Sequence, residues 1–229
     1  MGILYIVSTP IGNLQDITLR AIEIIKNTEY IACEDTRKTS FLIKFLSGKF
    51  GSFGDKFLFS VYEENEVKRI PEILNLLQNG KNVALISDAG TPLISDPGFK
   101  LVRECLAIGT KVESVPGPSS VISALVVSGL PSDKFTFVGF LPKKPGHRKT
   151  FLENLKKSLA LIKTTVIILE SPFRLVKTLE ELQTVFGDRE AVVARELTKI
   201  HEEVRKGKIS KLIAHYQTTS PKGEIVVLF

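Results

Sequence analysis

The sequence predicts an α/β protein made of two α/β lobes with mostly parallel sheets. Short apolar, β-rich runs alternate with helical patterns along the chain, which is typical of parallel sheets with helices on both faces. A break at Pro116-Gly-Pro-Ser-Ser120 interrupts this alternation near its middle. We therefore expect an N-terminal α/β lobe over residues 1–115 and a C-terminal α/β lobe over residues 116–229.

The first lobe contains five predicted strands and four predicted helices. The strands are Ile3–Ser8, Tyr30–Cys33, Phe57–Val61, Val83–Ser87 and Lys111–Val115, and the helices lie near Ile17–Lys26, Thr36–Leu46, Glu64–Leu77 and Phe99–Ile108. Asp16 is the predicted N-cap of the first helix, because acidic side chains accept hydrogen bonds from free helix N–H groups.

The second lobe continues the alternation. Strands are predicted at Phe135–Phe140, Thr165–Glu170, Glu190–Arg195 and Gly223–Phe229, with helices at Ser119–Ser128 and near Arg148–Ala160, Pro172–Phe186 and Ile209–Tyr216. The segment Arg195–Lys208 leaves room for one more short strand.

Composition excludes several classes of protein. The chain has 229 residues, of which 43% are hydrophobic and 24% charged, as in an ordinary globular protein. No apolar run approaches the roughly 18 residues of a membrane span, and no secretory signal precedes the first strand, so we expect a cytoplasmic protein without membrane contact. Cys33 and Cys105 lie far apart without metal-ligand spacing, which predicts two buried thiols and no metal site.

Basic residues gather in two segments of a chain whose formal charge is +6. The first contains Lys143, Lys144, His147, Arg148 and Lys149, and the second contains Arg205, Lys206, Lys208 and Lys211. Such clusters suit a polyanion such as RNA, but a solvated loop and a solvated helix face explain them equally well. We interpret residues 143–149 as a mobile loop.

The loop Asp88–Gly98 is the strongest sign of a binding site. Gly90 and Gly98 permit positive φ and close backbone approach, and the loop is longer than the usual βα connection of about 2–6 residues. A tight connection capped by aspartate and serine is the alternative. Similar polar loops follow other predicted strands, at Thr9–Asp16, Glu34–Arg37, Pro116–Ser120, Glu170–Arg174 and Arg195–Lys199. Ligands bind at the carboxyl ends of parallel strands and between lobes, so we expect these loops to converge on an inter-lobe cleft.

Common catalytic fingerprints are absent. The sequence has no G-x-G-x-x-G after the first strand, no P-loop, no H-E-x-x-H and no G-x-S-x-G. His147, His201 and His215 lie in basic or helical contexts that suit surface residues. These absences disfavour Rossmann dehydrogenases, P-loop enzymes and serine hydrolases.

Seven ordered motifs carry a resemblance that spans essentially the whole chain. They are Ser8-Thr-Pro-Ile-Gly-Asn-Leu14, Glu34-Asp-Thr-Arg37, Ser87-Asp-Ala-Gly-Thr-Pro92 with Ser95-Asp-Pro-Gly98, Pro116-Gly-Pro-Ser-Ser120, Gly139-Phe-Leu-Pro142, Glu170-Ser-Pro-Phe-Arg174 and Ala194-Arg-Glu-Leu-Thr-Lys199. Together they resemble the bacterial 16S ribosomal RNA cytidine-2′-O-methyltransferases of the tetrapyrrole methylase superfamily. Relatives with corrin-type substrates carry Gly-Asp-Pro where this chain has Gly90-Thr-Pro92, which favours the RNA branch.

The resemblance implies S-adenosylmethionine held between two lobes, a homodimer, and 16S ribosomal RNA or the assembled small subunit as partner, with no role for DNA. Its cofactor-contacting positions correspond here to Pro10, Ala89, Gly90, Thr91, Ile94, Ser119, Ser120, Leu169, Glu196, Leu197, Gly223 and Glu224. Longer members of the RNA branch continue beyond the last strand with a small helical segment. If that segment helps to bind RNA, either RNA binding in this chain depends more on its two basic segments or the chain is truncated.

Methyl transfer to a ribose hydroxyl needs in-line positioning and a group that accepts the hydroxyl proton. Our candidates for the proton acceptor are Asp35, Asp88 and Glu170, with a neutral lysine as another possibility, and Arg37, Arg174, Arg195 and Lys199 are candidates for orientation. Ion pairs among these same residues are the structural alternative. Two other functions stay open: a methyltransferase for a small molecule such as a tetrapyrrole precursor, and a noncatalytic nucleotide-binding module.

Overall fold

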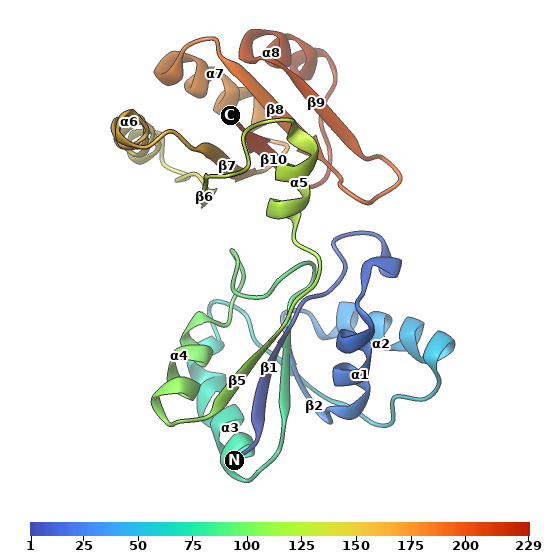
Figure 1. The fold of residues 1–229 in the computed structure, drawn as a ribbon. Coiled ribbons are helices and arrows are strands. Elements are labelled where there is room, and N and C mark those ends of the chain that lie inside the picture. Colours follow the sequence, from blue (N-terminus) through green and yellow to red (C-terminus); the bar gives the residue numbers. More distant parts are fainter. The chain divides into compact units, whose positions relative to one another are not determined.

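The computed structural model describes residues 1–229 and forms two compact units, Met1–Ser119 and Ser120–Phe229 (Figure 1). The boundary predicted after Val115 lies before residues 116–119, which the structure assigns to the first unit. Each unit is a five-stranded sheet covered by helices on both faces, so the predicted α/β class is confirmed.

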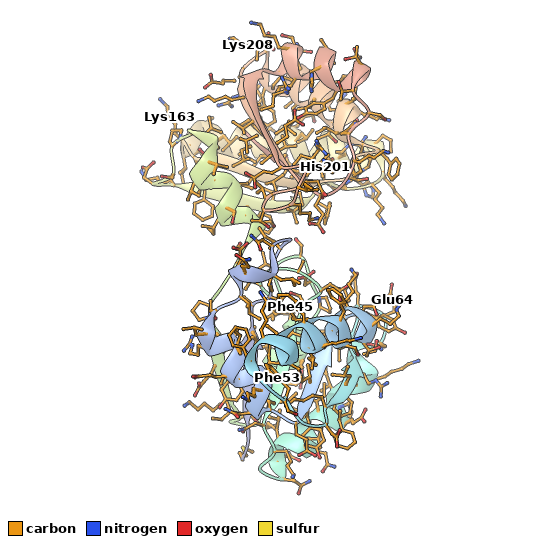
Figure 2. All side chains as sticks on the ribbon, turned by 90° about the vertical axis from the view of Figure 1, so that its right-hand side faces the viewer. Phe45, Phe53, Glu64, Lys163, His201 and Lys208 are labelled. Carbon is orange, nitrogen blue, oxygen red and sulfur yellow. The ribbon has the colours of Figure 1, made fainter.

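The first unit contains a fully parallel sheet in the order β3-β2-β4-β1-β5. Its strands are β1 (Ile3–Val7), β2 (Tyr30–Cys33), β3 (Phe57–Ser60), β4 (Val83–Ile86) and β5 (Lys111–Val115), and its helices are α1 (Leu19–Asn27), α2 (Thr36–Phe50), α3 (Glu66–Gln78) and α4 (Phe99–Ala107), with a 3₁₀ turn at Leu14–Asp16. Two apolar cores, one on each face, hold α1 and α2 against one side and α3 and α4 against the other. Phe53 is buried in the first core and Phe45 packs at its edge (Figure 2).

The predicted cap of the first helix is wrong. Thr18, not Asp16, is the N-cap of α1, and its hydroxyl accepts a hydrogen bond from the Ala21 N–H at 3.1 Å. Ile17 and Thr18 are extended, with ψ of 136° and 150°, so the helix cannot begin before Leu19. Asp16 lies in the preceding 3₁₀ turn.

The second unit contains a mixed sheet in the order β6-β7-β10-β8-β9. Its strands are β6 (Phe135–Phe140), β7 (Thr165–Glu170), β8 (Glu190–Arg195), β9 (Glu203–Lys208) and β10 (Ile225–Leu228), and its helices are α5 (Ser120–Ser128), α6 (Pro145–Leu161), α7 (Leu175–Phe186) and α8 (Ile209–Thr218). Helices α6, α7 and α8 share one apolar core, while α5 packs on β8, β9 and β10.

The prediction of a mostly parallel sheet is wrong for this second unit. Only β6 and β7 are parallel, whereas β10 runs antiparallel to both β7 and β8, and β9 antiparallel to β8. The connection between β8 and β9, residues 196–202, contains no helix, and antiparallel strands can be joined by such a short segment. Strand β9 lies within Arg195–Lys208, the segment in which the sequence left room for one more short strand.

The basic segment 143–149 is not a loop throughout. Helix α6 begins at Pro145, a residue suited to the first helical turn, and it includes His147, Arg148 and Lys149. Cys33 and Cys105 are free and buried, and burial raises the pKa of the Cys105 thiol to about 11. None of the helices combines the length and apolar character needed to cross a membrane.

Candidate functional site

The predicted loops of the first unit meet at one edge of its sheet. Strands β2, β4, β1 and β5 are neighbours and parallel, so their carboxyl ends lie side by side. Thr9 and Gly90 exchange two backbone hydrogen bonds, of 2.9 and 3.0 Å. The Thr91 hydroxyl lies 3.0 Å from the Ser8 hydroxyl and donates to the Pro118 carbonyl at 3.0 Å. Three of the loops expected to converge are therefore joined by direct hydrogen bonds.

The loop after β4 has an unusual backbone. Leu93 and Ser95 adopt φ of 72° and 63°, a region that side chains disfavour, and Gly90 adopts 82°. Only two further non-glycine residues have positive φ, and both follow β8: Glu196 at 51° and Thr198 at 65°. Such strain costs about 1–3 kcal/mol per residue and gathers at ligand sites. The positive-φ non-glycine residues are therefore confined to two segments, and the family resemblance assigns cofactor contacts to both.

Beside the β4 loop lies an open depression of about 380 Å³. Its lining residues are Glu34, Asp35, Thr36, Arg37, Ser60, Tyr62 and Asp88. The Asp88 carboxylate accepts the Asp35 N–H at 3.0 Å and pairs with the Lys38 ammonium at 2.8 Å, so two candidate residues lie together here. The depression has room for a polar group of a substrate next to the β4 loop.

The carboxyl groups of this depression differ in basicity. Hydrogen bonds from the Arg37 side chain and N–H hold the pKa of Asp35 well below its usual range. Burial, together with the nearby Asp88 charge, raises the pKa of Glu34. A proton acceptor works best when its pKa is close to the working pH. Glu34, which the sequence reasoning passed over although it precedes Asp35 in the motif, is therefore better suited than Asp35.

In the second unit, the segment after β8 and the start of β10 form one polar cluster. The Glu196 side chain accepts the Glu224 N–H at 2.9 Å and the Lys199 ammonium at 2.8 Å, and Lys199 also contacts Glu224 at 3.1 Å. A Cβ on Gly223 would lie 2.2 Å from the Glu196 carboxyl carbon. This close approach explains why Gly223 must be glycine, and it places four predicted residues together.

Charges in this cluster reinforce one another. Burial alone would raise the pKa of Glu196, but hydrogen bonds from Lys199 and the Glu224 N–H lower it. For Lys199, burial would lower the pKa, yet Glu196 and Glu224 raise it. Lys199 therefore stays protonated, which excludes it as a neutral proton acceptor and leaves it suited to orientation.

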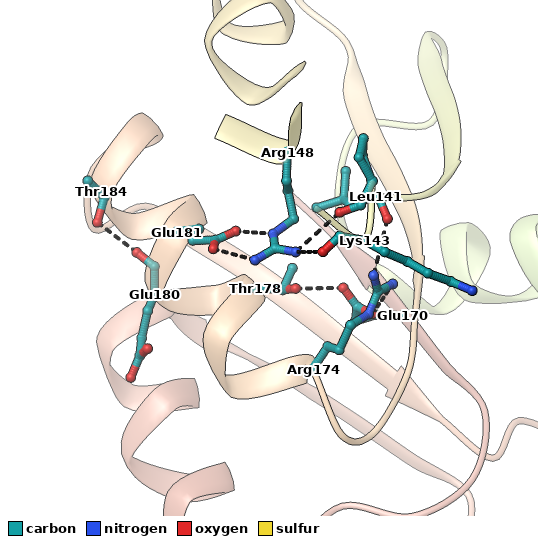
Figure 3. Close-up of polar contacts among 10 residues, drawn as sticks. Leu141, Lys143, Arg148, Glu170, Arg174, Thr178, Glu180, Glu181 and Thr184 are labelled. Atoms are coloured by element: carbon teal, nitrogen blue, oxygen red, sulfur yellow. Dashed lines mark hydrogen bonds and ion pairs between the residues drawn. The ribbon is translucent and has the colours of Figure 1, made fainter. Parts of the chain in front are cut away.

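Glu170 and Arg174 form a buried structural pair (Figure 3). The Glu170 side chain, 0% exposed, accepts from Arg174 at 2.8 Å, from the Thr178 hydroxyl at 2.6 Å and from the Ser171 N–H at 2.7 Å. A proton acceptor must reach the substrate, and this carboxylate is enclosed by its donors. The geometry therefore favours the ion-pair alternative for Glu170 and Arg174 over a role of Glu170 as proton acceptor.

The remaining candidates are spread over both units. Arg195 pairs with Glu203 at 3.2 Å and donates to the Lys222 carbonyl. Pro10 is buried beside Thr9, Ser119 ends the first unit, Ser120 begins α5, and Leu169 lies on β7 opposite Val226 of β10. Leu197 is buried, and Ile94 is exposed on the β4 loop.

The histidines and the second basic segment have ordinary surroundings. His147 is exposed, as is His201 (labelled in Figure 2), and the His215 ring lies 3.6 Å from Glu203. Arg205 and Lys206 belong to strand β9, not to a helix, and pair with Glu203 and Glu190 at 2.9 and 3.1 Å. This segment is therefore already partly neutralised by glutamates.

Comparison with known proteins identifies the family. The model described as Tetrapyrrole (Corrin/Porphyrin) Methylases matches residues 3–213. Among solved structures, uroporphyrin III C-methyl transferase of Thermus thermophilus aligns with a TM-score of 0.66 and 18% identity, covering 99% of this chain and 97% of that one. The same enzyme complexed with S-adenyl homocysteine aligns with a TM-score of 0.64. At this identity, the structural likeness shows the fold alone.

The chain thus belongs to the tetrapyrrole (corrin/porphyrin) methylase family, a family of methyltransferases. Within it, the chain is similar to proteins named Ribosomal RNA small subunit methyltransferase I. The Thermotoga maritima protein is 48% identical over 228 residues, covering 100% of this chain and 98% of its own length. The Hydrogenobaculum sp. protein is 43% identical, covering 98% of this chain and 94% of its own length. These relatives confirm the resemblance seen in the motifs.

Proposed function

We propose that this methyltransferase uses S-adenosylmethionine to methylate the 2′-oxygen of a cytidine ribose in 16S ribosomal RNA, free or within the small subunit, in the cytoplasm. The names of its relatives supply the substrate class. One structural observation carries the assignment of the site: all four positive-φ non-glycine residues lie in, or directly beside, two segments that the resemblance assigns to the cofactor.

The residues of these segments fit an adenosine-containing cofactor. Gly90 is buried at positive φ, and a Cβ there would lie 3.3 Å from the Ile11 side chain, so a larger residue would shift the loop that carries the proposed contacts. The proposed contacts of the first unit are Pro10, Ala89–Thr91, Ile94 and Ser119, and those of the second are Ser120, Leu169, Glu196, Leu197, Gly223 and Glu224. When bound, S-adenosylmethionine supplies a methyl group on a positively charged sulfur.

The depression beside the β4 loop is the proposed seat of the target ribose. Glu34 is the proposed acceptor of the hydroxyl proton, because its raised pKa makes it a better base than Asp35. Asp88 holds the loop geometry through Asp35 and Lys38. Arg37, whose side chain is 89% exposed, remains available to a phosphate of the substrate.

Transfer of a tritiated methyl group tests this function. Purified protein should label 16S RNA in small subunits or as free RNA, with the label on a cytidine 2′-oxygen, and should leave tetrapyrrole precursors unlabelled. Label in a tetrapyrrole precursor without label in RNA would instead establish the small-molecule alternative. No transfer to any acceptor, despite S-adenosylmethionine binding, would favour a binding module.

We also propose a homodimer. The resemblance suggests it, and α5 presents Ile122 and Val126, one turn apart, as exposed apolar side chains. Most homodimers use a two-fold symmetric interface. Light scattering at micromolar concentration should report twice the 25.4 kDa chain mass. A fully active monomer would refute the dimer.

A further inference from the structure

Two exposed phenylalanines lie at neighbouring strand ends of the second unit. Phe140 ends β6 and is 56% exposed, and Phe173 lies in the loop after β7 and is 97% exposed. Strands β6 and β7 are parallel neighbours, and Phe140 pairs in register with Leu169. The two loops therefore leave the same edge of the sheet. The proposed methyl transfer chemistry uses neither phenyl ring.

Two arginines, the buried Arg148 and the partly exposed Arg174, join and fix these two loops (Figure 3). Arg174, directly after Phe173, donates to the Leu141 carbonyl, directly after Phe140, at 3.2 Å. Arg148 donates to the Lys143 carbonyl at 3.1 Å and pairs through two nitrogens with Glu181. An exposed Phe173 is thus held on a rigid support, so little conformational freedom is lost when its ring contacts a ligand.

The surroundings of the rings are positively charged. Lys143 and Lys144 are exposed and form no ion pair, and in Figure 3 the Lys143 side chain extends away from the arginine–glutamate network. Residues 140–147 and 171–173 contain no acidic residue. The nearby Glu170 and Glu181 are neutralised by Arg174 and Arg148. We call Phe140, Lys143, Lys144 and Phe173 the aromatic–basic platform.

We propose that this platform binds a single-stranded segment of RNA, with the Phe173 ring stacked on an unpaired base and Lys143 and Lys144 contacting the phosphates beside it. Exposed aromatic rings within a basic surface are the usual arrangement for single-stranded nucleic acid. A second copy of the chain fits less well, because a two-fold contact would bring the same lysines against one another. The inference rests on the proposed function and specifies the form of its RNA.

Binding of a short, fluorescein-labelled single-stranded RNA, followed by anisotropy at several salt concentrations, tests the platform. Phe173→Ala should weaken binding about tenfold without changing its salt dependence, because stacking is uncharged. Phe173→Tyr should bind as the unchanged protein does, and Phe173→Leu should resemble Phe173→Ala. Replacing Lys143 and Lys144 with serine should reduce the steepness of log affinity against log salt by about 1.4, because each phosphate contact with single-stranded RNA contributes about 0.7.

Phe135→Ala is the matched control, since Phe135 is an exposed ring at the opposite end of β6, and it should leave RNA affinity unchanged. Equal affinity of Phe173→Ala and the unchanged protein would overturn the proposal, as would full affinity of Phe173→Leu. A lower mass of Phe173→Ala in light scattering, with equal RNA affinity, would assign the ring to a contact between copies. RNA binding that depends on Phe173, without any methyl transfer to RNA, would refute the proposed function and keep the platform.

Discussion

Gly90→Val should raise the Kd for S-adenosylmethionine by about 100-fold, equivalent to about 2.7 kcal/mol. Gly90 adopts φ of 82°, where a β-branched residue is strained, and its Cβ would lie 3.3 Å from Ile11 and 3.9 Å from the Pro118 carbonyl. The valine methyl groups must then displace the Thr9–Gly90 hydrogen bonds or occupy the space above the loop. Isothermal titration calorimetry with the full chain measures this change.

Gly80→Val is the control that distinguishes a direct loss of cofactor affinity from a general loss of stability. Gly80 adopts φ of 79°, nearly the same backbone strain, but a Cβ there meets nothing within 4 Å, and the residue lies between α3 and β4, far from the carboxyl edge of the sheet. Both variants should lose stability in urea through their strained backbone, Gly90→Val the more because its side chain also crowds Ile11, while only Gly90→Val loses cofactor affinity. Unchanged affinity in a folded Gly90→Val protein would refute the placement of the cofactor on the β4 loop.

The sequence predicted individual elements of the fold more successfully than their pairing. Tyr30–Cys33, Lys111–Val115 and Phe135–Phe140 have the predicted boundaries, because each is a short β-rich run between polar or turn residues. Strand β10 inserts between β7 and β8, and local sequence does not encode which distant strand it joins or in which direction. That choice depends on the packing of the whole unit.

The same limit applies to the site. Loops after parallel strands could be assigned to one edge because strand direction alone brings their ends together. Arg148 looked like a solvent-exposed member of a basic run, since its partner Glu181 lies 33 residues further along the chain. For Glu170 the sequence left two possibilities open, a proton acceptor and an ion pair, and Arg174 four residues later was a visible sign of the pair that the structure shows. The burial of a charged side chain shows whether it is enclosed in an ion pair or free to contact a substrate, and only the tertiary structure reveals that burial.

Glu181→Ala should destabilise the second unit by about 3 kcal/mol. The Arg148 side chain is 4% exposed, and the variant would leave its guanidinium buried with only the Pro142 and Lys143 carbonyls as acceptors. An uncompensated buried charge costs more than the ion pair itself contributes. Urea unfolding measures the loss, and hydrogen exchange should locate it in α6 and α7, which the pair joins.

Glu180→Ala is the control, because Glu180 is exposed on the same helix and its side chain points away from Arg148 (Figure 3), so its loss should cost less than about 0.5 kcal/mol. A double variant, Arg148→Met with Glu181→Leu, removes both charges and should recover most of the stability. If Glu181→Ala were as stable as Glu180→Ala, the stabilising role of the Arg148–Glu181 pair would be refuted. Because Arg148 also fixes the Lys143 backbone through a hydrogen bond, Glu181→Ala should weaken RNA binding as well. The double variant lacks that hydrogen bond but has no unpaired buried charge, so its RNA affinity shows which of the two changes weakens binding.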